Sequence, residues 1–236
     1  TTVMKFNGTS WVSVGSPGFS AGNATYQSLA IGSDGTPYVA YRDNGNSGKA
    51  NVMTFNKDTS SWVNVGIPGV SANAVSYLSL DIAPDGTPYV AYRDDGNNNT
   101  AMVMKLIDSY TWIPVGGTPI TSDPASFESL KIDKNGTLYL AFEDNAHGFR
   151  ASVVKFNGAS WVNVGNPGFS VSSASYESLA IAPDGTLYLA YRDANSEKTS
   201  VMKFNNTSWV SVGNPEFATY NNTAYQSLDI APDGTP

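Results

Sequence analysis

One hairpin motif recurs five times along the chain and restricts the folds that the sequence can adopt. The fullest copy, residues 176–193, reads as an apolar strand, an Asp-Gly turn and a second strand of alternating aromatic and aliphatic residues. Asp-Gly or Asn-Gly between such runs is the strongest short-range hairpin signal, because both turn residues favour a positive φ. The other copies lie at residues 26–43, 77–94, 127–144 and 225–236. Five copies of one hairpin predict a repeat architecture.

The period of the repeat matches a four-stranded unit. Tryptophan recurs every 48 to 51 residues, at Trp11, Trp62, Trp112, Trp161 and Trp209. Each unit contains four apolar runs, exemplified from first to fourth strand by residues 26–31, 38–43, 3–6 and 11–15. No segment shows the 3.6-residue periodicity of a helix. We therefore predict an all-β fold, a five-bladed β-propeller of four-stranded antiparallel blades.

We expect one propeller domain over residues 1–236. The repeat units span approximately residues 1–49, 50–100, 101–150, 151–198 and 199–236. The sequence starts at a third strand, and its fifth copy stops at Pro236, ahead of a second strand. The ring should therefore close by pairing of the N- and C-terminal segments, with the last blade incomplete and its free edge open to self-association. The expected core between blades comprises Phe6, Trp11, Leu29, Ile31, Tyr38, Tyr41 and their equivalents.

Composition excludes several classes of function. Thirteen basic and twenty acidic residues give a net charge of −7, which argues against a nucleic-acid partner because phosphate binding needs a basic surface. No apolar run approaches the roughly 18–20 residues that span a bilayer. The chain has no cysteine, so disulfides and thiolate metal sites are excluded. This composition, rich in Asn, Thr and Gly, fits an extracellular or cell-surface protein.

Copies such as SLAIAPDGTLYLAYRD, followed by VMKFNNTSWVSVG, resemble bacterial β-propeller repeats. The apolar strand, Asp-Gly turn and Tyr-Val-Ala pattern is similar to NHL-like repeats. The five-unit count and interleaved ends are similar to five-bladed tachylectin-type lectins. The resemblance covers essentially the whole chain and implies the propeller fold. Tachylectin-type sugar sites depend on a Gly-Gly-Trp turn that is missing from this sequence, so no binding residue carries over.

The second strand ends in Arg-Asp in three copies and in Glu-Asp in one, at the face that carries the long polar loops. Function is usually located on such loops. These side chains could bind sugar hydroxyls beside an aromatic platform. Alternatively, each Asp caps its loop and each Arg pairs with it. The candidate ligand-binding residues are Arg42, Asp43, Arg93, Asp94, Glu143, Asp144, Arg192 and Asp193. We favour a non-enzymatic, lectin-like module that binds glycans at repeated weak sites.

Two other functions stay open. One is a structural or self-assembling module of a surface or fibre. The other is a glycoside hydrolase with Glu128 and Glu177 as carboxylates in the central funnel. We expect no enzymatic activity, because the repeats lack the irregular insertions that active sites usually introduce. The loops at residues 43–46 and 94–97 lack the ligand spacing of a calcium site, so we expect neither metal nor cofactor.

Overall fold

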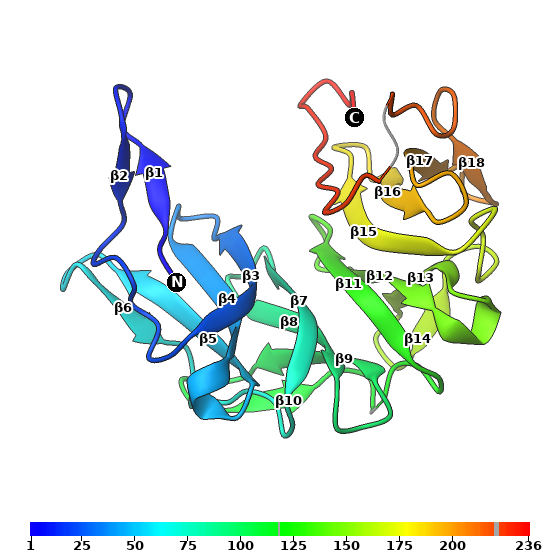
Figure 1. Ribbon diagram of the computed structural model, residues 1–236. Coiled ribbons are helices and arrows are strands. Elements are labelled where there is room, and N and C mark those ends of the chain that lie inside the picture. Colours follow the sequence, from blue (N-terminus) through cyan, green and yellow to red (C-terminus); the bar gives the residue numbers. More distant parts are fainter. Residues whose placement is uncertain (118, 220–221) are drawn as a thin grey trace.

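The computed structural model describes residues 1–117, 119–219 and 222–236 and contains five antiparallel sheets in an arc (Figure 1). Four sheets have four strands each, and the first has two. The two-stranded sheet consists of β1 (Met4–Phe6) and β2 (Trp11–Ser13). The all-β prediction, with four-stranded antiparallel blades, is confirmed.

Each four-stranded sheet follows chain order. The first contains β3 (Ala24–Ile31), β4 (Pro37–Asp43), β5 (Lys49–Asn56) and β6 (Ser61–Asn64). The second contains β7 (Val75–Ile82), β8 (Pro88–Asp94), β9 (Thr100–Leu106) and β10 (Trp112–Pro114). The third contains β11 (Ala125–Ile132), β12 (Leu138–Asp144), β13 (Arg150–Phe156) and β14 (Trp161–Asn163). The fourth contains β15 (Ala174–Ile181), β16 (Leu187–Asp193), β17 (Thr199–Phe204) and β18 (Trp209–Ser211). Two short 3-10 helices, η1 (Asn44–Asn46) and η2 (Asn145–His147), follow β4 and β12.

The Asp-Gly hairpins form as predicted, but their turn geometry differs. Only the glycine has a positive φ, 75° at Gly35, whereas Asp34 does not. The Asp34 carboxylate accepts a hydrogen bond from the Thr36 N–H at 2.9 Å. Gly32 and Thr36 close the loop through a backbone hydrogen bond of 2.8 Å. The loop is therefore a turn followed by a left-handed glycine, stabilised by an Asp side chain.

Serine hydroxyls on the first strands join each sheet to the next. The hydroxyl of Ser79 accepts a hydrogen bond from the Leu130 N–H at 2.9 Å, and that of Ser129 accepts one from Leu179 at 3.0 Å. The same bond joins Ser28 to Leu80 and Ser178 to Leu228. These bonds bring β3, β7, β11 and β15 together along the inside of the arc.

Tryptophans on the fourth strands make a second repeated contact on the outside of the arc. The Trp112 indole N–H donates to the Val65 carbonyl oxygen at 3.0 Å, and the Trp161 N–H donates to Val115 at 2.9 Å. Trp62 and Trp209 make the same bond to Val14 and Val164. The packing role predicted for the tryptophan series is confirmed for these four.

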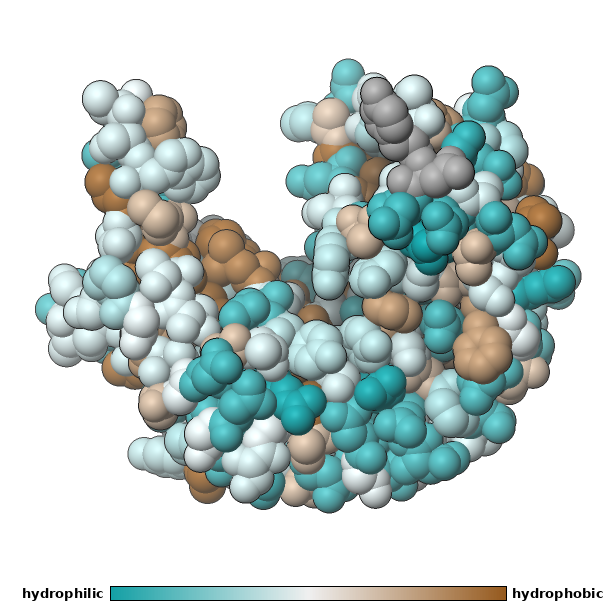
Figure 2. All heavy atoms as spheres, viewed as in Figure 1, coloured by the Kyte–Doolittle hydropathy of each residue, from teal (hydrophilic) through white to brown (hydrophobic). Residues whose placement is uncertain are grey.

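The N- and C-terminal segments do not pair, so the expectation of a closed ring is wrong. Among the described residues, β1 pairs only with β2, and residues 222–236 form no strand. The two ends lie on opposite sides of an opening (Figures 1 and 2). A strand forms only where a neighbour about 5 Å away supplies the hydrogen bonds, and across the opening none does.

The open arc also changes the expected core. Tyr41 is fully buried, as predicted. However, Trp11 in the two-stranded sheet is 67% exposed, and Leu29 in the first four-stranded sheet is 53% exposed, because no further sheet covers these side chains at the opening. Phe6 and Ile31 are exposed for the same reason. Leu80, the equivalent of Leu29 in the second sheet, is only 4% exposed. Within the described residues no helix has the length and apolar character to cross a membrane.

Candidate active site beside the central cavity

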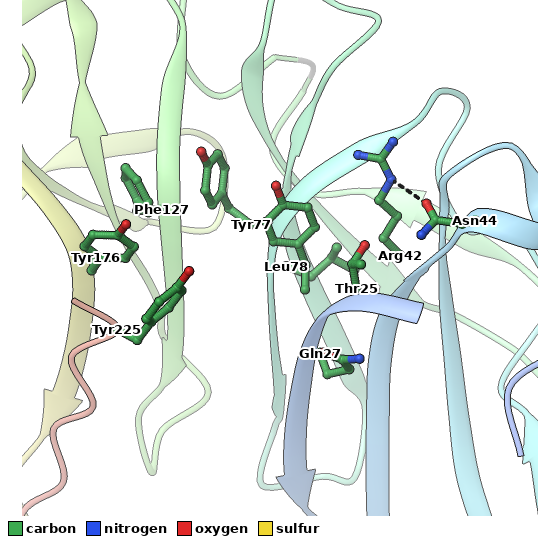
Figure 3. A pocket seen from close by; sticks show the side chains of 10 residues that line it. Thr25, Gln27, Arg42, Asn44, Tyr77, Leu78, Phe127, Tyr176 and Tyr225 are labelled. Atoms are coloured by element: carbon green, nitrogen blue, oxygen red, sulfur yellow. Dashed lines mark hydrogen bonds between the residues drawn. The ribbon is translucent and has the colours of Figure 1, made fainter. Parts of the chain in front are cut away.

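A cavity of about 850 Å³ lies at the ends of the first strands and is walled by aromatic side chains (Figure 3). Each first strand has a bulge near its start, such as the register shift between Ser126 and Ser129 in β11. Bulges re-aim side chains, and here the re-aimed residue is aromatic in all four first strands. Tyr225 occupies the equivalent position in the C-terminal segment, whose described residues form no strand. The five aromatic residues are Tyr26, Tyr77, Phe127, Tyr176 and Tyr225.

The five aromatic residues all have a left-handed backbone, with φ between 51° and 58°. Such a conformation is costly for a bulky side chain and persists only where the surroundings compensate for it. Part of the compensation is ring packing, because neighbouring centroids lie 4.5 to 5.3 Å apart. The result is a continuous aromatic wall around the cavity.

The residue that follows the aromatic differs from copy to copy. The five residues are Gln27, Leu78, Glu128, Glu177 and Gln226. Glu128 is 5% exposed and Glu177 is 7% exposed. Neither oxygen of either carboxyl has a hydrogen-bond partner among the described residues. Two buried, unpaired carboxyls in a repeat that otherwise carries Gln or Leu need an explanation beyond folding.

Burial determines the protonation of both carboxyls. It raises the pKa of Glu128 to about 8, although the nearby Arg93 guanidinium opposes the shift. Burial also raises the pKa of Glu177 well above its ordinary value, and the neighbouring Glu143 and Glu128 add to the effect. The pKa of Glu143 is raised to about 7, again chiefly by burial and against the influence of Arg93. At neutral pH, Glu128 therefore holds its proton.

Arg93 and Asp95 form an ion pair next to these carboxyls. The Arg93 Nε lies 2.9 Å from Asp95 Oδ1, and the guanidinium lies 4.9 Å from the centre of the Tyr77 ring. Asp95 Oδ2 accepts a hydrogen bond from the Ser76 hydroxyl at 2.9 Å and lies 3.5 Å from Arg42 Nη1. The cluster thus combines carboxyls whose pKa is raised by burial with a carboxylate, that of Asp95, which is held by cations. Environments that separate the protonation of neighbouring acids in this way are typical of acid–base catalysis.

The aspartates of the predicted Arg-Asp sites are occupied by their own loops. Asp43 accepts a hydrogen bond from the Gly45 N–H at 2.9 Å, and Asp94 accepts one from Gly96 at 3.1 Å. Asp193 accepts one from the Asn195 N–H at 2.9 Å. Asp144 accepts from the Ser152 hydroxyl at 2.7 Å and pairs with the only histidine, His147, at 2.8 Å. All four are at most 8% exposed, so they fit the loop-capping interpretation.

The Arg and Glu members of these sites have different surroundings. Arg42 lines the cavity, and Arg93 lies beside Glu128 and Glu143. Arg192 instead pairs with Glu197 at 3.1 Å. The structure therefore brings Arg93, Glu143 and both funnel glutamates together and leaves Arg192 outside this group.

Asp95 and the aromatic wall were not among the predicted site residues. The signal for Asp95 was its departure from the repeat, since the equivalent positions are Asn44, Asn145 and Ala194. The aromatic residues gave no such signal, because an aromatic residue occupies this position in every copy of the repeat. Among the described residues, no group of three or more His, Asp or Glu side chains could hold a metal ion.

Comparison with solved structures finds chains of similar architecture. No protein-family model and no curated protein matches the sequence. A Hadza microbial sialidase has a similar structure, with a TM-score of 0.60 and 19% identity over 84% of this chain. An α-L-arabinanase from Penicillium chrysogenum, complexed with arabinobiose, has a TM-score of 0.59 and 15% identity over 90% of this chain and 71% of its own. The GH93 α-L-arabinofuranosidase of Fusarium graminearum has a TM-score of 0.54 and 16% identity over 80% of this chain and 65% of its own.

These similarities show the β-propeller fold, and the match covers only 47% of the sialidase chain. They also correct two expectations. A non-enzymatic, lectin-like module was favoured and enzymatic activity was not expected, yet the enzymes named above cleave glycosidic bonds on this architecture. The physical reason for the error is that regular repeats were interpreted as evidence against an active site. In this chain single substitutions within the repeat, rather than insertions, change the chemistry of the cavity.

Proposed function

We propose that this protein is a glycoside hydrolase whose reacting groups lie in the cluster of Glu128, Asp95, Glu143 and Glu177. The observation that carries the proposal is the pair of buried, unpaired carboxyls at Glu128 and Glu177, next to a cavity walled by aromatic rings. Glycoside hydrolysis needs one carboxylic acid that donates a proton and one carboxylate that activates water or attacks the sugar. The similar architectures of the sialidase, arabinanase and arabinofuranosidase support this choice.

The cluster suggests a division of roles. Glu128, with its pKa raised to about 8, would protonate the oxygen of the leaving sugar at neutral pH. Asp95, held by Arg93 and Ser76, would be the ionised partner. The carboxyl oxygens of Glu128 are covered by protein, so a substrate would have to displace part of the aromatic wall to reach them.

The test is hydrolysis of a panel of aryl glycosides of arabinofuranose, galactose, galacturonic acid and sialic acid. We expect turnover of at least one, with kcat/KM falling as the pH rises through about 8, where Glu128 loses its proton. Glu128→Gln should reduce kcat by about 10²–10⁴-fold, the usual contribution of a general acid. Glu216→Gln, at an exposed acid, is the control and should leave the rate unchanged. The proposal fails if no glycoside is cleaved, or if Glu128→Gln is as active as the wild type.

The finer family assignments also remain proposals. The likeness to NHL-like and tachylectin-type repeats concerns the repeat pattern, and glycan binding follows from the proposed activity.

Self-association across the opening between the two ends of the arc is an independent proposal. It is supported by the exposed Trp11 and Leu29 on the first sheets. Sedimentation at increasing protein concentration would test it.

A further inference from the structure

Arg42 has an unusual position in the cavity described above. Of the side chains that line the cavity, all within the described residues, it alone carries a formal charge. The chain as a whole has a net charge of −7, so general electrostatic attraction would not draw an anion to this place. A single guanidinium in the wall of an aromatic cavity instead indicates local recognition of an anionic group.

Comparison of the repeat copies shows that the positive charge of Arg42 is balanced less closely by a carboxylate than the charges of the equivalent Arg93 and Arg192. Arg93 has an acid two residues later and pairs with Asp95 at 2.9 Å, and Arg192 pairs with Glu197 at 3.1 Å. The corresponding neighbour of Arg42 is the neutral Asn44. The carboxylate nearest to Arg42 is that of Asp95, at 3.5 Å, and Arg93 already holds it more closely.

The guanidinium of Arg42 is fixed in orientation and keeps donors free. Its Nε donates to the Asn44 side-chain oxygen at 3.1 Å, and its Nη1 donates to the Val75 carbonyl at 3.2 Å and to Asp95 Oδ2 at 3.5 Å. Nη2 makes no hydrogen bond to any described residue, and the side chain is 28% exposed. A guanidinium that is oriented in advance and has one unused NH₂ group can donate charge-assisted hydrogen bonds to a carboxylate.

The cavity has a polar side and an aromatic side. Arg42, Asn44 and Gln27 lie on one side, whereas Phe127, Tyr176 and Tyr225 lie on the other (Figure 3). Aromatic faces pack against the apolar face of a sugar ring, and planar donors on the facing side fix its substituents. The raised pKa values of Glu128 and Glu143 reduce the negative charge that would otherwise oppose an anion here.

We propose that the cavity binds glycans that carry carboxylates, such as uronic-acid residues, with the carboxylate on Arg42 and the sugar ring on the aromatic wall. This inference rests on the proposed function, which identifies the cavity as the substrate site. Asn44 contributes by being neutral, because an acid at this position would neutralise Arg42 as Asp95 neutralises Arg93.

The experiment compares binding of two oligosaccharides by calorimetry, in the Glu128→Gln background to prevent turnover. The probes are an α-1,4-linked galacturonate oligomer and the neutral galactose oligomer of the same length and linkage. We expect the acidic oligomer to bind at least tenfold more tightly, with the preference falling as salt is added. Arg42→Gln should abolish the preference, and Asn44→Asp should do the same by pairing with Arg42. Arg192→Gln, at an arginine that does not line the cavity, should preserve it.

Equal binding of the two oligomers, or a preference that survives Arg42→Gln, overturns the inference. Hydrolysis by the wild type separates it from the proposed function. If only neutral glycosides are cleaved, the activity stands and the acidic substrate class falls. If the acidic oligomer binds through Arg42 but no glycoside is cleaved, the recognition stands and the enzymatic role falls.

Discussion

At the scale of single residues, the main feature is the burial of ionisable groups without partners. The pKa of Glu128 is raised from an ordinary value of 4.5 to about 8, so its charged form is disfavoured in the folded state. At pH values below 4.5 the carboxyl is neutral in both states and imposes no cost. As the pH rises toward 8, the Glu128 carboxyl ionises in the unfolded chain but not in the folded protein, so the free energy of unfolding falls. A shift of this size corresponds to roughly 5 kcal/mol when complete.

Glu128→Gln should therefore stabilise the protein in a pH-dependent way. The amide cannot ionise, so the cost of burying a carboxyl disappears where it is largest. We expect the melting temperature to rise by about 5 °C or more at pH 9, and by less than about 2 °C at pH 4.5. Scanning calorimetry at the two pH values measures the difference.

The control for this prediction is Glu216→Gln, because Glu216 is exposed. It should change the melting temperature little at either pH. An equal gain at pH 9 and pH 4.5 for Glu128→Gln would contradict the argument, since it would mean that packing rather than ionisation had changed.

At the scale of elements, each fourth strand is followed by a Val-Gly pair, and all of these pairs except Val212-Gly213 receive a tryptophan from the next sheet. Gly66 has a φ of 75°, and a Cβ there would lie 2.5 Å from the Trp112 indole nitrogen. The glycine is thus required both for its backbone conformation and for the close approach of the ring. Gly213 has a similar φ of 67° but nothing within 4 Å of the same position. Comparison of Gly66 with Gly213 therefore separates the need for a left-handed backbone from the need for space beside the tryptophan ring.

We predict that Gly66→Ala destabilises the protein more than Gly213→Ala. Both substitutions place a side chain in a left-handed conformation, which costs about 1–2 kcal/mol. Only Gly66→Ala also pushes Trp112 away from the Val65 carbonyl, which should add roughly 1–3 kcal/mol. Urea denaturation of both variants measures the difference, and equal losses would show that the tryptophan contact adds nothing.

At the scale of the whole molecule, the sheets are joined by the serine hydrogen bonds along the inside of the arc. In a repeat protein, stability depends on these interfaces between neighbours as much as on each unit. Ser129 joins the third sheet to the fourth and is 8% exposed. Ser227, the equivalent on the C-terminal segment, is exposed, and no described backbone N–H donates to it.

Ser129→Ala should lower the free energy of unfolding by about 1–3 kcal/mol, because it leaves the buried Leu179 N–H without an acceptor. Ser227→Ala is the matched control and should have almost no effect. Chemical denaturation gives the free energies, and hydrogen exchange at the Leu179 amide should accelerate only in the first variant. Unchanged exchange in Ser129→Ala would mean that the serine bond does not hold the sheets together.

The sequence by itself determined the hairpins, the four-strand order and the packing role of Trp62, Trp112, Trp161 and Trp209, because strand alternation and Asp-Gly turns act over a few residues. It also identified Glu128 and Glu177 as candidate carboxyls, at a repeat position that carries Gln or Leu in the other copies. Only the tertiary structure decided that these carboxyls are buried without partners, that Asp95 lies between Arg42 and Arg93, and that the arc stays open at Trp11 and Leu29. These features depend on which sheets come together in space. Protonation and exposure follow from that packing, and a linear pattern does not specify it.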